Sequence, residues 1–299
     1  MPETEQSTTI RLGLPKGRMH AGVMKLLADA GIDVRVNSRG YRPRVSLPGV
    51  NAKILKPQNI IEMLHAGSRD LGFAGSDWVA ELGYGTGGDD RIVDLLDTGL
   101  DRVKLVVAAP PEFVENGRLR PTDRPLRVAA EMTALASDWF QKAGVEARII
   151  RTYGATEVFP PEDADCVVDI AASGDTLRAN GLTVVDTVAS SSTRLLASRE
   201  AWEDPARRPK IESFLVVVRS VLEARSRVMI DLNVTRERLE TVVEALPSMR
   251  EPTVSQLRSE SGFAVRAAVP SDQVAELVPV LSERGATDIV VTRPTQIVP

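Results

Sequence analysis

The stretch that decides the fold is VVDIAASGDTLRANGL, residues 167–182. It has the pattern of an apolar strand that ends near Asp169, followed by a sharp turn and a short helix. Such a turn leaves several backbone N–H groups unpaired and directed at one point, where a phosphate can bind. Gly174 lets the backbone approach the anion, and the hydroxyls of Ser173 and Thr176 add donors. The sequence therefore predicts a phosphate-binding turn.

Two carboxylates in this stretch need a separate role, because Asp169 and Asp175 would repel a bare phosphate. They are suited to accept hydrogen bonds from ribose hydroxyls, or to hold a Mg2+ ion that the ligand carries. The alternative is a strand, an Asx-type turn and a capped helix without a ligand, and the pattern alone leaves this open. A P-loop nucleotide hydrolase is excluded, because the chain has no G-x-x-x-x-G-K motif.

The composition is that of a soluble globular protein, with 43% hydrophobic and 26% charged residues over 299 positions. This length suggests two domains, or three lobes, because single cores rarely exceed roughly 250 residues. Cys166 is expected to be a small buried hydrophobe, and with His20 and His65 it forms no usual metal-binding spacing. No apolar leader and no run of about 18 apolar residues is present, so we expect a cytoplasmic protein that does not bind membranes.

The charge is unevenly distributed. The net charge of −4 argues against nucleic-acid binding. Between Arg11 and Lys56, however, ten Lys or Arg residues accompany two Asp residues, a local excess of eight positive charges. Part of this segment is the turn Pro15–Arg18, which places two cations between a first strand and a first helix. Such a segment favours binding of a small polyanion, and the alternative is a solvated basic face.

Strands and helices alternate along the first three quarters of the chain, which predicts an α/β protein with largely parallel sheets. In addition to the strand 10–14 and the helix that Gly31 closes, the expected strands are 71–75, 103–109, 127–130, 147–151, 166–171, 183–188 and 192–197, and the expected helices are 59–66, 134–143, 175–180 and 211–224.

The last segment changes in character. Strands are expected at 227–234, 253–257, 263–269 and 289–292, with one helix at 236–246 and a second that begins at Ser271 as its cap and ends at Gly285. The order β-α-β-β-α-β is that of a ferredoxin-like module. The segment contains no candidate nucleophile–base pair, so binding or regulation is favoured over chemistry there.

Four blocks of this sequence resemble the long form of ATP phosphoribosyltransferase. They are LPKGR at 14–18, DLGFAGSD at 70–77, the run from GATE at 154–157 to Leu177, and EPTVSQL at 251–257. The resemblance implies a two-lobed catalytic core like a type II periplasmic binding protein, with the active site in its cleft. It also implies a C-terminal ACT-like domain that binds L-histidine as a feedback inhibitor, and a homo-oligomer in which dimers associate into hexamers.

The implied reaction transfers the phosphoribosyl group of phosphoribosyl pyrophosphate to N1 of ATP and releases pyrophosphate, which is the first step of histidine biosynthesis. Mg2+ would assist by neutralising the pyrophosphate. The implied division is a catalytic domain, 1–224, and a regulatory domain, 225–299. Within the first, one lobe covers about 10–105 and 189–224, and the other covers about 106–188.

The resemblance also assigns site residues in this numbering. Lys16 and Asp169 are the expected catalytic residues, and the metal is expected to bind through the substrate, without a confident protein ligand. Phosphoribosyl pyrophosphate is expected to contact Asp169, Ser173, Gly174, Asp175, Thr176 and Leu177; ATP or pyrophosphate is expected to contact Lys16, Gly17, Arg18, Lys56, Asp77 and Glu157; and histidine is expected to contact Asp231, Thr253 and Ser255.

The sequence departs from the family pattern at two blocks that bear on nucleotide binding. Lys56 stands where the family usually has Arg, which keeps the charge but loses the bidentate fork. Residues 132–135 are Met-Thr-Ala-Leu instead of the common Tyr-Pro-Asn-Leu, a block expected to face the nucleotide. The alternative function is therefore a non-catalytic small-molecule-binding or regulatory paralogue. Retention of Lys16, Asp169 and Thr176 argues against it.

Overall fold

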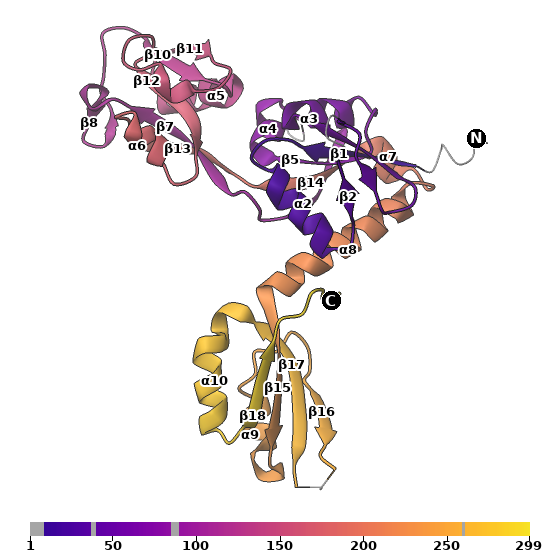
Figure 1. Cartoon of the computed structure of the whole chain (residues 1–299). Coiled ribbons are helices and arrows are strands. Elements are labelled where there is room, and N and C mark those ends of the chain that lie inside the picture. Colours follow the sequence, from indigo (N-terminus) through magenta and orange to yellow (C-terminus); the bar gives the residue numbers. More distant parts are fainter. Residues whose placement is uncertain (1–8, 37–39, 85–89, 259–260) are drawn as a thin grey trace, which may run out of the picture. The chain divides into compact units, whose positions relative to one another are not determined.

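The structure is a computed structural model that describes residues 9–36, 40–84, 90–258 and 261–299. The chain packs as two units. The core unit comprises Met1–Lys25 and Ile32–Glu212, and the C-terminal unit comprises Leu26–Gly31 and Ser213–Pro299. Figure 1 shows the elements of each unit. Within the part of the chain that the structure describes, no helix is long and apolar enough to cross a membrane.

The first lobe of the core unit is built on a five-stranded mixed sheet. Its strands, in spatial order, are β4 (Val50–Leu55), β1 (Ile10–Pro15), β5 (Leu71–Gly75), β14 (Thr193–Ser198) and β6 (Ile92–Asp97). The first three are parallel, whereas β14 is antiparallel to both of its neighbours. Its helices are α2 (His20–Asp29), α3 (Pro57–His65), α4 (Ser76–Glu81) and α7 (Arg199–Glu203).

Helix α3 lies very close to this sheet because two strand positions carry no side chain. A Cβ atom at Gly72 would lie 2.5 Å from Cγ2 of Ile60, and one at Gly13 would lie 3.0 Å from the same atom. Ile60 is fully buried as a result. Glycine at position 72 is therefore required by the helix–sheet packing, and at position 13 any side chain would crowd Ile60. This packing fixes the start of α3 beside the ends of β1 and β4.

The second lobe is also built on a five-stranded mixed sheet. Its sheet has the order β11 (Ala147–Arg151), β10 (Leu126–Ala130), β12 (Cys166–Ala171), β7 (Val103–Ala109) and β13 (Thr183–Ser191). Strands β10, β11 and β12 are parallel, and β7 is antiparallel to β12 and β13. Helices α5 (Thr133–Ala143) and α6 (Asp175–Ala179) belong to this lobe. Both sheets are thus mixed, whereas the sequence predicted largely parallel sheets.

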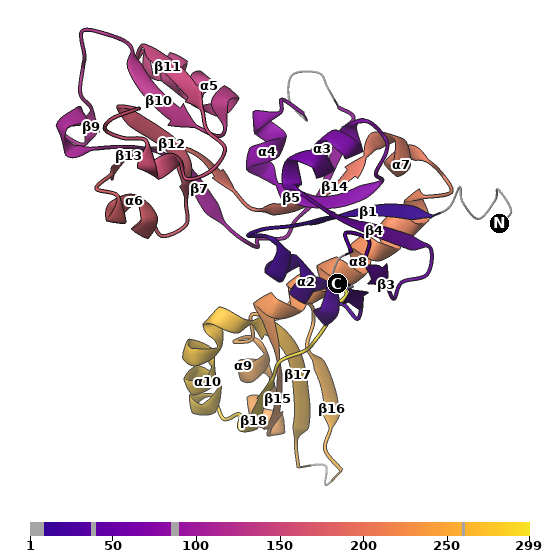
Figure 2. The same ribbon diagram turned by 45° about the horizontal axis from the view of Figure 1, so that its top comes forward.

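The chain passes between the two lobes twice. It leaves the first sheet after β6 and enters the second at β7, and it returns from β13 directly into β14 (Figure 2). Short elements complete the core unit: β2 (Val34–Arg35), β3 (Arg44–Val45), β8 (Val114–Glu115), β9 (Arg118–Leu119) and the 3-10 turns η1 (Pro111–Phe113) and η2 (Thr156–Val158).

Each lobe is braced by a buried aspartate immediately before its third parallel strand. Asp70 accepts the Arg11 N–H at 2.6 Å and its Nε–H at 2.9 Å. In the second lobe, Asp165 accepts an N–H of Arg124 at 2.6 Å and the backbone N–H of Arg127 at 2.8 Å. The hydrogen bond from Arg124 holds the pKa of Asp165 far below its ordinary value. Arg11, counted in the basic segment, therefore serves the fold, so part of that charge excess is not available to a ligand.

The C-terminal unit has the ferredoxin-like arrangement that the sequence predicts. Its antiparallel sheet has the order β16 (Thr253–Gln256), β17 (Phe263–Pro270), β15 (Arg227–Val234) and β18 (Thr287–Thr292). Helices α9 (Leu239–Val243) and α10 (Val274–Glu283) bury Val242 and Leu281 against it. Helix α8 (Arg208–Ser226) precedes β15.

Two helix boundaries in this unit differ from the prediction. The expected helix 236–246 is a 3-10 turn, η3 (Arg236–Arg238), followed by the short α9. Ser271 does not cap a helix, because it lies inside a second 3-10 turn, η4 (Ser271–Gln273), and α10 begins only at Val274 without a side-chain cap.

Candidate functional site

The predicted phosphate turn has the expected strand–turn–helix geometry. Gly174 has φ +77° and is the residue before α6, where L side chains are strained. The turn is exposed, while Leu177 is 1% exposed and anchors α6 in the core of the second lobe. The Thr176 hydroxyl makes no hydrogen bond with any residue that the structure describes. The turn is therefore an accessible backbone loop on a fixed support.

The two carboxylates of this stretch differ in their surroundings. Asp175 accepts hydrogen bonds from the Ser173 hydroxyl and from Arg178, and these contacts lower its pKa. Asp169 has no cationic partner among the described residues, and its Oδ1 accepts only the N–H of Ile170, at 2.7 Å. Of the two carboxylates, Asp169 is therefore the one that remains available to a ligand.

Burial raises the pKa of Asp169 to about 6, and the negative charges of Glu157 and Glu131 add to the effect. Glu157 is held near Asp169 by a local bend in which Ala155 has φ +49° and the hydroxyls of Thr152 and Thr156 bond at 2.8 Å. The structure thus places Glu157 near enough to Asp169 for its charge to raise the pKa of that carboxyl. Glu131 was not predicted, and its only sequence signal is its place directly after β10.

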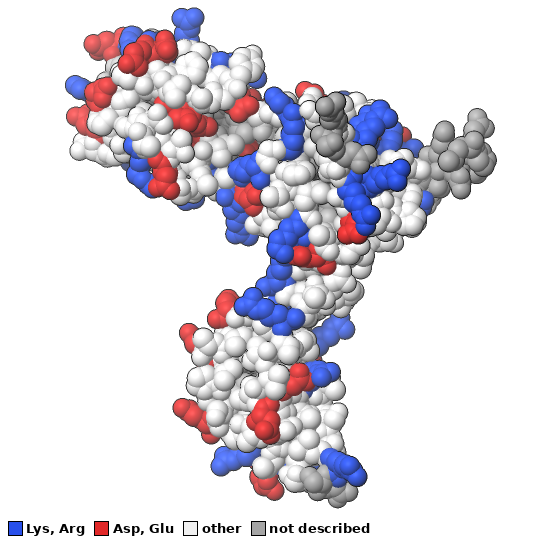
Figure 3. Space-filling view, viewed as in Figure 1, with Lys and Arg blue, Asp and Glu red and all other residues white. Residues whose placement is uncertain are grey.

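The cations of the first lobe gather where parallel strands end. The N–H of Lys16 donates to the carbonyl of Leu55 at 2.9 Å, so the chain places Lys16 and Lys56 side by side after β1 and β4. Neither ammonium forms an ion pair with a described residue. Arg18 donates to the carbonyl of Asp101 at 2.6 Å, and Gly17 between the two cations has φ +78°. In Figure 3 basic side chains are spread over this lobe, whereas acidic side chains are frequent on the second.

Asp77 is buried instead of facing the solvent. Its residue is 4% exposed, its Oδ1 accepts the N–H of Trp78 at 2.8 Å, and its own N–H donates to Ser191 at 3.1 Å. Burial raises its pKa. A Cβ at Gly75 would lie 2.1 Å from its Oδ1, so glycine is required there. This geometry favours a supporting role for Asp77, beside the substrate contact that the sequence predicted.

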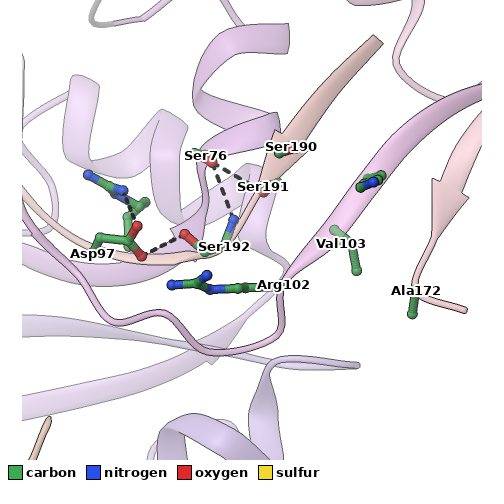
Figure 4. A pocket seen from close by; sticks show the side chains of 10 residues that line it. Ser76, Asp97, Arg102, Val103, Ala172, Ser190, Ser191 and Ser192 are labelled. Atoms are coloured by element: carbon green, nitrogen blue, oxygen red, sulfur yellow. Dashed lines mark hydrogen bonds and ion pairs between the residues drawn. The ribbon is translucent and has the colours of Figure 1, made fainter. Parts of the chain in front are cut away.

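A cavity of about 510 Å3 lies where the chain crosses between the lobes (Figure 4). We call it the crossing cavity. Its lining consists of Ser76, Asp97, Arg102, Val103, Lys104, Ala172, Ser190, Ser191, Ser192 and Arg194. Sequence reasoning missed this cavity, although three consecutive serines at the end of β13 are a visible signal. It lies next to two predicted site segments, since Ser76 precedes Asp77 and Ala172 precedes the phosphate turn.

One side of the crossing cavity is a fixed network. Arg194 forms ion pairs with Asp94 and Asp97, each at 2.8 Å, and Ser192 donates to Asp97 at 2.6 Å. Burial opposes the charge of Asp97, but the bond from Ser192 and the nearby cations outweigh it, so its pKa is lowered.

The block 132–135, expected to face the nucleotide, is occupied by a protein carboxylate. Met132, 1% exposed, precedes α5 without providing a side-chain cap. Glu81, from α4 of the first lobe, accepts the N–H groups of Ala134 and Leu135, each at 3.0 Å, and contacts the Thr133 hydroxyl at 3.4 Å. These backbone donors are therefore used to join the lobes and are not free for a ligand.

The three residues predicted to bind histidine lie together in the C-terminal unit. A second cavity, of about 320 Å3, is lined by Asp231, Leu232, Asn233, Thr253, Ser255, Ala264, Val265, Arg266 and Asp288. Asp231 and Thr253 are both cross-strand neighbours of Arg266, and Asp231 forms an ion pair with it at 2.5 Å. Arg266 and Asp288 were not predicted, because their strands pair only in the folded sheet.

These features define a class: a two-lobed α/β protein with a phosphate-type turn and unpaired cations in one unit, and a ferredoxin-like module in the other. Comparison with known proteins makes this specific. A family model described as ATP phosphoribosyltransferase matches residues 56–246, and one described as "HisG, C-terminal domain" matches residues 224–294. The chain belongs to the ATP phosphoribosyltransferase family, in its long form.

Similar proteins agree over the whole length. An ATP phosphoribosyltransferase of Pelotomaculum thermopropionicum is 33% identical over 97% of this chain and 99% of its own, and that of Desulforudis audaxviator is 34% identical over 94% and 96%. An ATP phosphoribosyl transferase (HisG:HisZ) complex from Thermotoga maritima matches the fold with a TM-score of 0.60 at 23% identity, covering 72% of this chain and 99% of that one. The resemblance drawn from the four sequence blocks is confirmed.

Proposed function

We propose that this chain transfers the phosphoribosyl group of phosphoribosyl pyrophosphate to N1 of ATP, as the first step of histidine biosynthesis. The observation that carries the proposal is the exposed turn at 173–177 beside Asp169, in a chain of the ATP phosphoribosyltransferase family. The bond from adenine N1 to C1′ forms as the bond from C1′ to pyrophosphate breaks, and the electron pair leaves with pyrophosphate.

The residues divide this work between positioning and charge neutralisation. The N–H groups of the turn and the Thr176 hydroxyl hold the 5′-phosphate, and Asp169 accepts hydrogen bonds from ribose hydroxyls. Lys16 and Lys56 face the departing pyrophosphate with Arg18 beside them. Because the transition state has oxocarbenium character, fixed orientation and neutralised leaving-group charge lower the barrier without a covalent intermediate.

Enzymes of this family generally need a divalent metal, which we assign as Mg2+. No group of three or more His, Cys, Asp or Glu that could hold a metal is present among the described residues. The donor set therefore fits a metal that is bound mainly by substrate phosphates, with Asp169 as the most available single carboxylate. Such an ion supplies charge neutralisation on the pyrophosphate.

The cavity of the C-terminal unit is proposed to bind L-histidine as a feedback inhibitor. Asp231 pairs with the ligand's ammonium group, Arg266 with its carboxylate, and the hydroxyls of Thr253 and Ser255 add hydrogen bonds. We further propose a division into a catalytic domain, 1–224, and a regulatory domain, 225–299, a cytoplasmic location, and assembly of dimers into hexamers. The alternative is that the regulatory domain serves assembly alone.

The test is direct product analysis. The full chain is mixed with ATP, phosphoribosyl pyrophosphate, Mg2+ and pyrophosphatase, and mass spectrometry follows one phosphoribosyl group added to ATP. We expect this adduct together with two inorganic phosphates for each adduct, because pyrophosphatase hydrolyses the pyrophosphate that is released. Substrate binding by calorimetry without any adduct would instead support the second candidate, a non-catalytic paralogue, which the changed block at 132–135 favours.

A further inference from the structure

We propose that the crossing cavity binds a di- or triphosphate chain, with the guanidinium of Arg102 and the ammonium of Lys104 as its charged ligands. The proposal deepens the function given above and rests on it, because that function supplies the polyphosphate. It adds an anion subsite that is separate from the turn at 173–177 and from Lys16, Arg18 and Lys56.

The charges that line the cavity favour an anion. Among the described residues, Arg102 and Lys104 form no side-chain hydrogen bond or ion pair. Arg194, by contrast, forms ion pairs with two aspartates. With Asp94, which pairs with Arg194, counted beside Asp97, the three lining cations and two aspartates leave a charge of +1. Arg102 feels the charge of Asp97 without a direct contact, and Lys104 has no partner among the described residues. Two exposed cations that no direct ion pair holds, at one cavity wall, suit a phosphate group.

Strand pairing directs one of these cations into the cavity. Lys104 lies opposite Ser190 of β13 on one side and opposite Ala171 of β12 on the other. Side chains that are directly opposite on neighbouring strands share a face of the sheet, so Lys104 and Ser190 line the cavity together. Ala171 leads into the turn at 173–177 within two residues. Lys104 therefore lies between the serine run and the proposed phosphate turn.

The floor of the cavity supplies hydroxyl groups with fixed positions. Ser191 and Ser192 are 6% and 8% exposed, and Ser76 contacts the Ser191 hydroxyl at 3.3 Å and accepts the N–H of Ser192 at 3.4 Å. These contacts join the end of β13, where the chain returns to the first lobe, to the start of α4, which is 115 residues away in sequence. Because the Ser192 hydroxyl already donates to Asp97, the hydroxyls of Ser76 and Ser191 are the ones that can reorient to donate to phosphate oxygens.

The lining also indicates which part of a substrate fits. A volume of about 510 Å3 is within the usual range for small-molecule sites. Only Val103 and Ala172 are apolar, and no aromatic ring is present among the lining residues on which a nucleobase could stack. A phosphate chain therefore fits, and the adenine does not. Its two sources are the triphosphate of ATP and the pyrophosphate of phosphoribosyl pyrophosphate.

The experiment uses the full chain and its Lys104→Ala, Arg102→Ala and doubly substituted variants. Arg148→Ala is the matched control, since Arg148 is an exposed arginine on β11 of the same sheet and has no ion pair with a described residue. Calorimetry with inorganic tripolyphosphate should show binding that each single variant weakens about tenfold and that the control leaves unchanged. All three changes are at exposed side chains, so the unfolding transition should not move.

Steady-state kinetics separates the two sources. A rise of about tenfold in KM for ATP alone assigns the cavity to the triphosphate, and the same rise for phosphoribosyl pyrophosphate alone assigns it to the leaving group. Unchanged tripolyphosphate affinity and unchanged KM values in the double variant would overturn the subsite and leave the proposed function standing. If the variants lose tripolyphosphate binding but the parent chain makes no adduct, the result would support the subsite and contradict the proposed function.

Discussion

Asp169 combines the strongest functional signal with an unfavourable environment. It is half-buried, it has no cationic partner among the described residues, and two glutamates repel its charge. Asp165, directly before the same strand β12, has the opposite surroundings. It forms ion pairs with two arginines, and its pKa is lowered. A carboxylate kept without compensation beside an exposed turn is typical of a functional group, because a purely structural one would be paired.

Replacing Asp169 with Asn should stabilise the protein at neutral and higher pH. The pKa of Asp169 is raised from 3.8 to about 6. Between these values the folded state binds more protons than the unfolded state, so the free energy of unfolding falls as the pH rises through this window. Asn keeps the acceptor for the Ile170 N–H and removes the charge. We expect Asp169→Asn to gain about 1–3 kcal/mol at pH 8.

Denaturant unfolding of both proteins at pH 8 and pH 4 measures this. The gain should disappear at pH 4, where the parent carboxyl is protonated in the folded state. Turnover of the variant should be lost at both values. A variant no more stable than the parent at pH 8 would show that the charge of Asp169 does not destabilise the fold. A variant that keeps full activity would show that the carboxylate is not functional.

The Thr176 hydroxyl gives a smaller test at the same scale. It has no partner among the described residues and adds one donor to a turn whose amides stay in place. Thr176→Ala should therefore weaken binding of phosphoribosyl pyrophosphate by about 1–2 kcal/mol, the order of one hydrogen bond, because the amides of the turn still hold the phosphate. Thr122→Ala, on the exposed loop before β10, is the control. Equal affinities of Thr176→Ala and the parent in calorimetry would remove this hydroxyl from the site.

At the scale of elements, α4 and α5 are joined by a cap that crosses between the lobes. Helix α5 has no side-chain cap of its own, and the buried carboxylate of Glu81 accepts its first N–H groups. A negative charge at this end of a helix is stabilising. We expect Glu81→Gln to lower the free energy of unfolding by about 1 kcal/mol and Glu81→Ala by about 2 kcal/mol.

Denaturant unfolding with Glu62→Gln as the control checks this prediction. Glu62 is an exposed glutamate on α3, so its substitution removes the same charge without a cap. The KM values of the Glu81 variants should also differ from those of the parent, because this cap joins the two lobes. If Glu81→Ala is no less stable than Glu62→Gln, the contact contributes nothing to the fold.

The predicted elements show which signals local sequence carries. Strands β5, β7, β11, β12 and β15 have the predicted bounds, because each is a continuous or alternating apolar run that ends at turn residues. Strands β4 and β6 were not predicted. Both are half-exposed, with Asn51 and Lys53 in one and two aspartates in the other, so tertiary pairing overrides weak local preference. Helix α9 ends earlier than predicted, although Leu246 beyond its end still packs in the core of this unit, so the apolar spacing reports burial there and not helix length.

At the scale of the molecule, the site is predicted only in part. The turn after β12 and the cations after β1 and β4 are each visible as one contiguous motif. The crossing cavity and the Glu81 cap arise from residues that meet only because β7 and β13 pass between two sheets, so no local pattern indicates them. The same holds for Arg266 and Asp288 in the C-terminal cavity.

Regulation is also tested on the whole chain. Asp231→Asn and Arg266→Ala should each abolish inhibition by histidine while turnover without histidine stays within a factor of about two, because both residues belong to the unit without the transferase site. An allosteric coupling of typical size, about 1–3 kcal/mol, would be lost. Arg250→Ala, an exposed change in the same unit, is the control. Inhibition that persists in both variants would place the histidine site elsewhere.

Binding of phosphoribosyl pyrophosphate to the turn at 173–177 is the event on which the proposed function depends, and calorimetry in the presence of Mg2+ measures it. Gly174→Val places a side chain where the phosphate must approach. Gly144→Val is the matched control, because Gly144 follows α5 with a similar positive φ of +67° and a Cβ atom there would have no neighbour within 4 Å. We expect the parent and Gly144→Val to bind alike and Gly174→Val to lose at least about a hundredfold in affinity. Equal affinity of Gly174→Val and the parent would contradict the account.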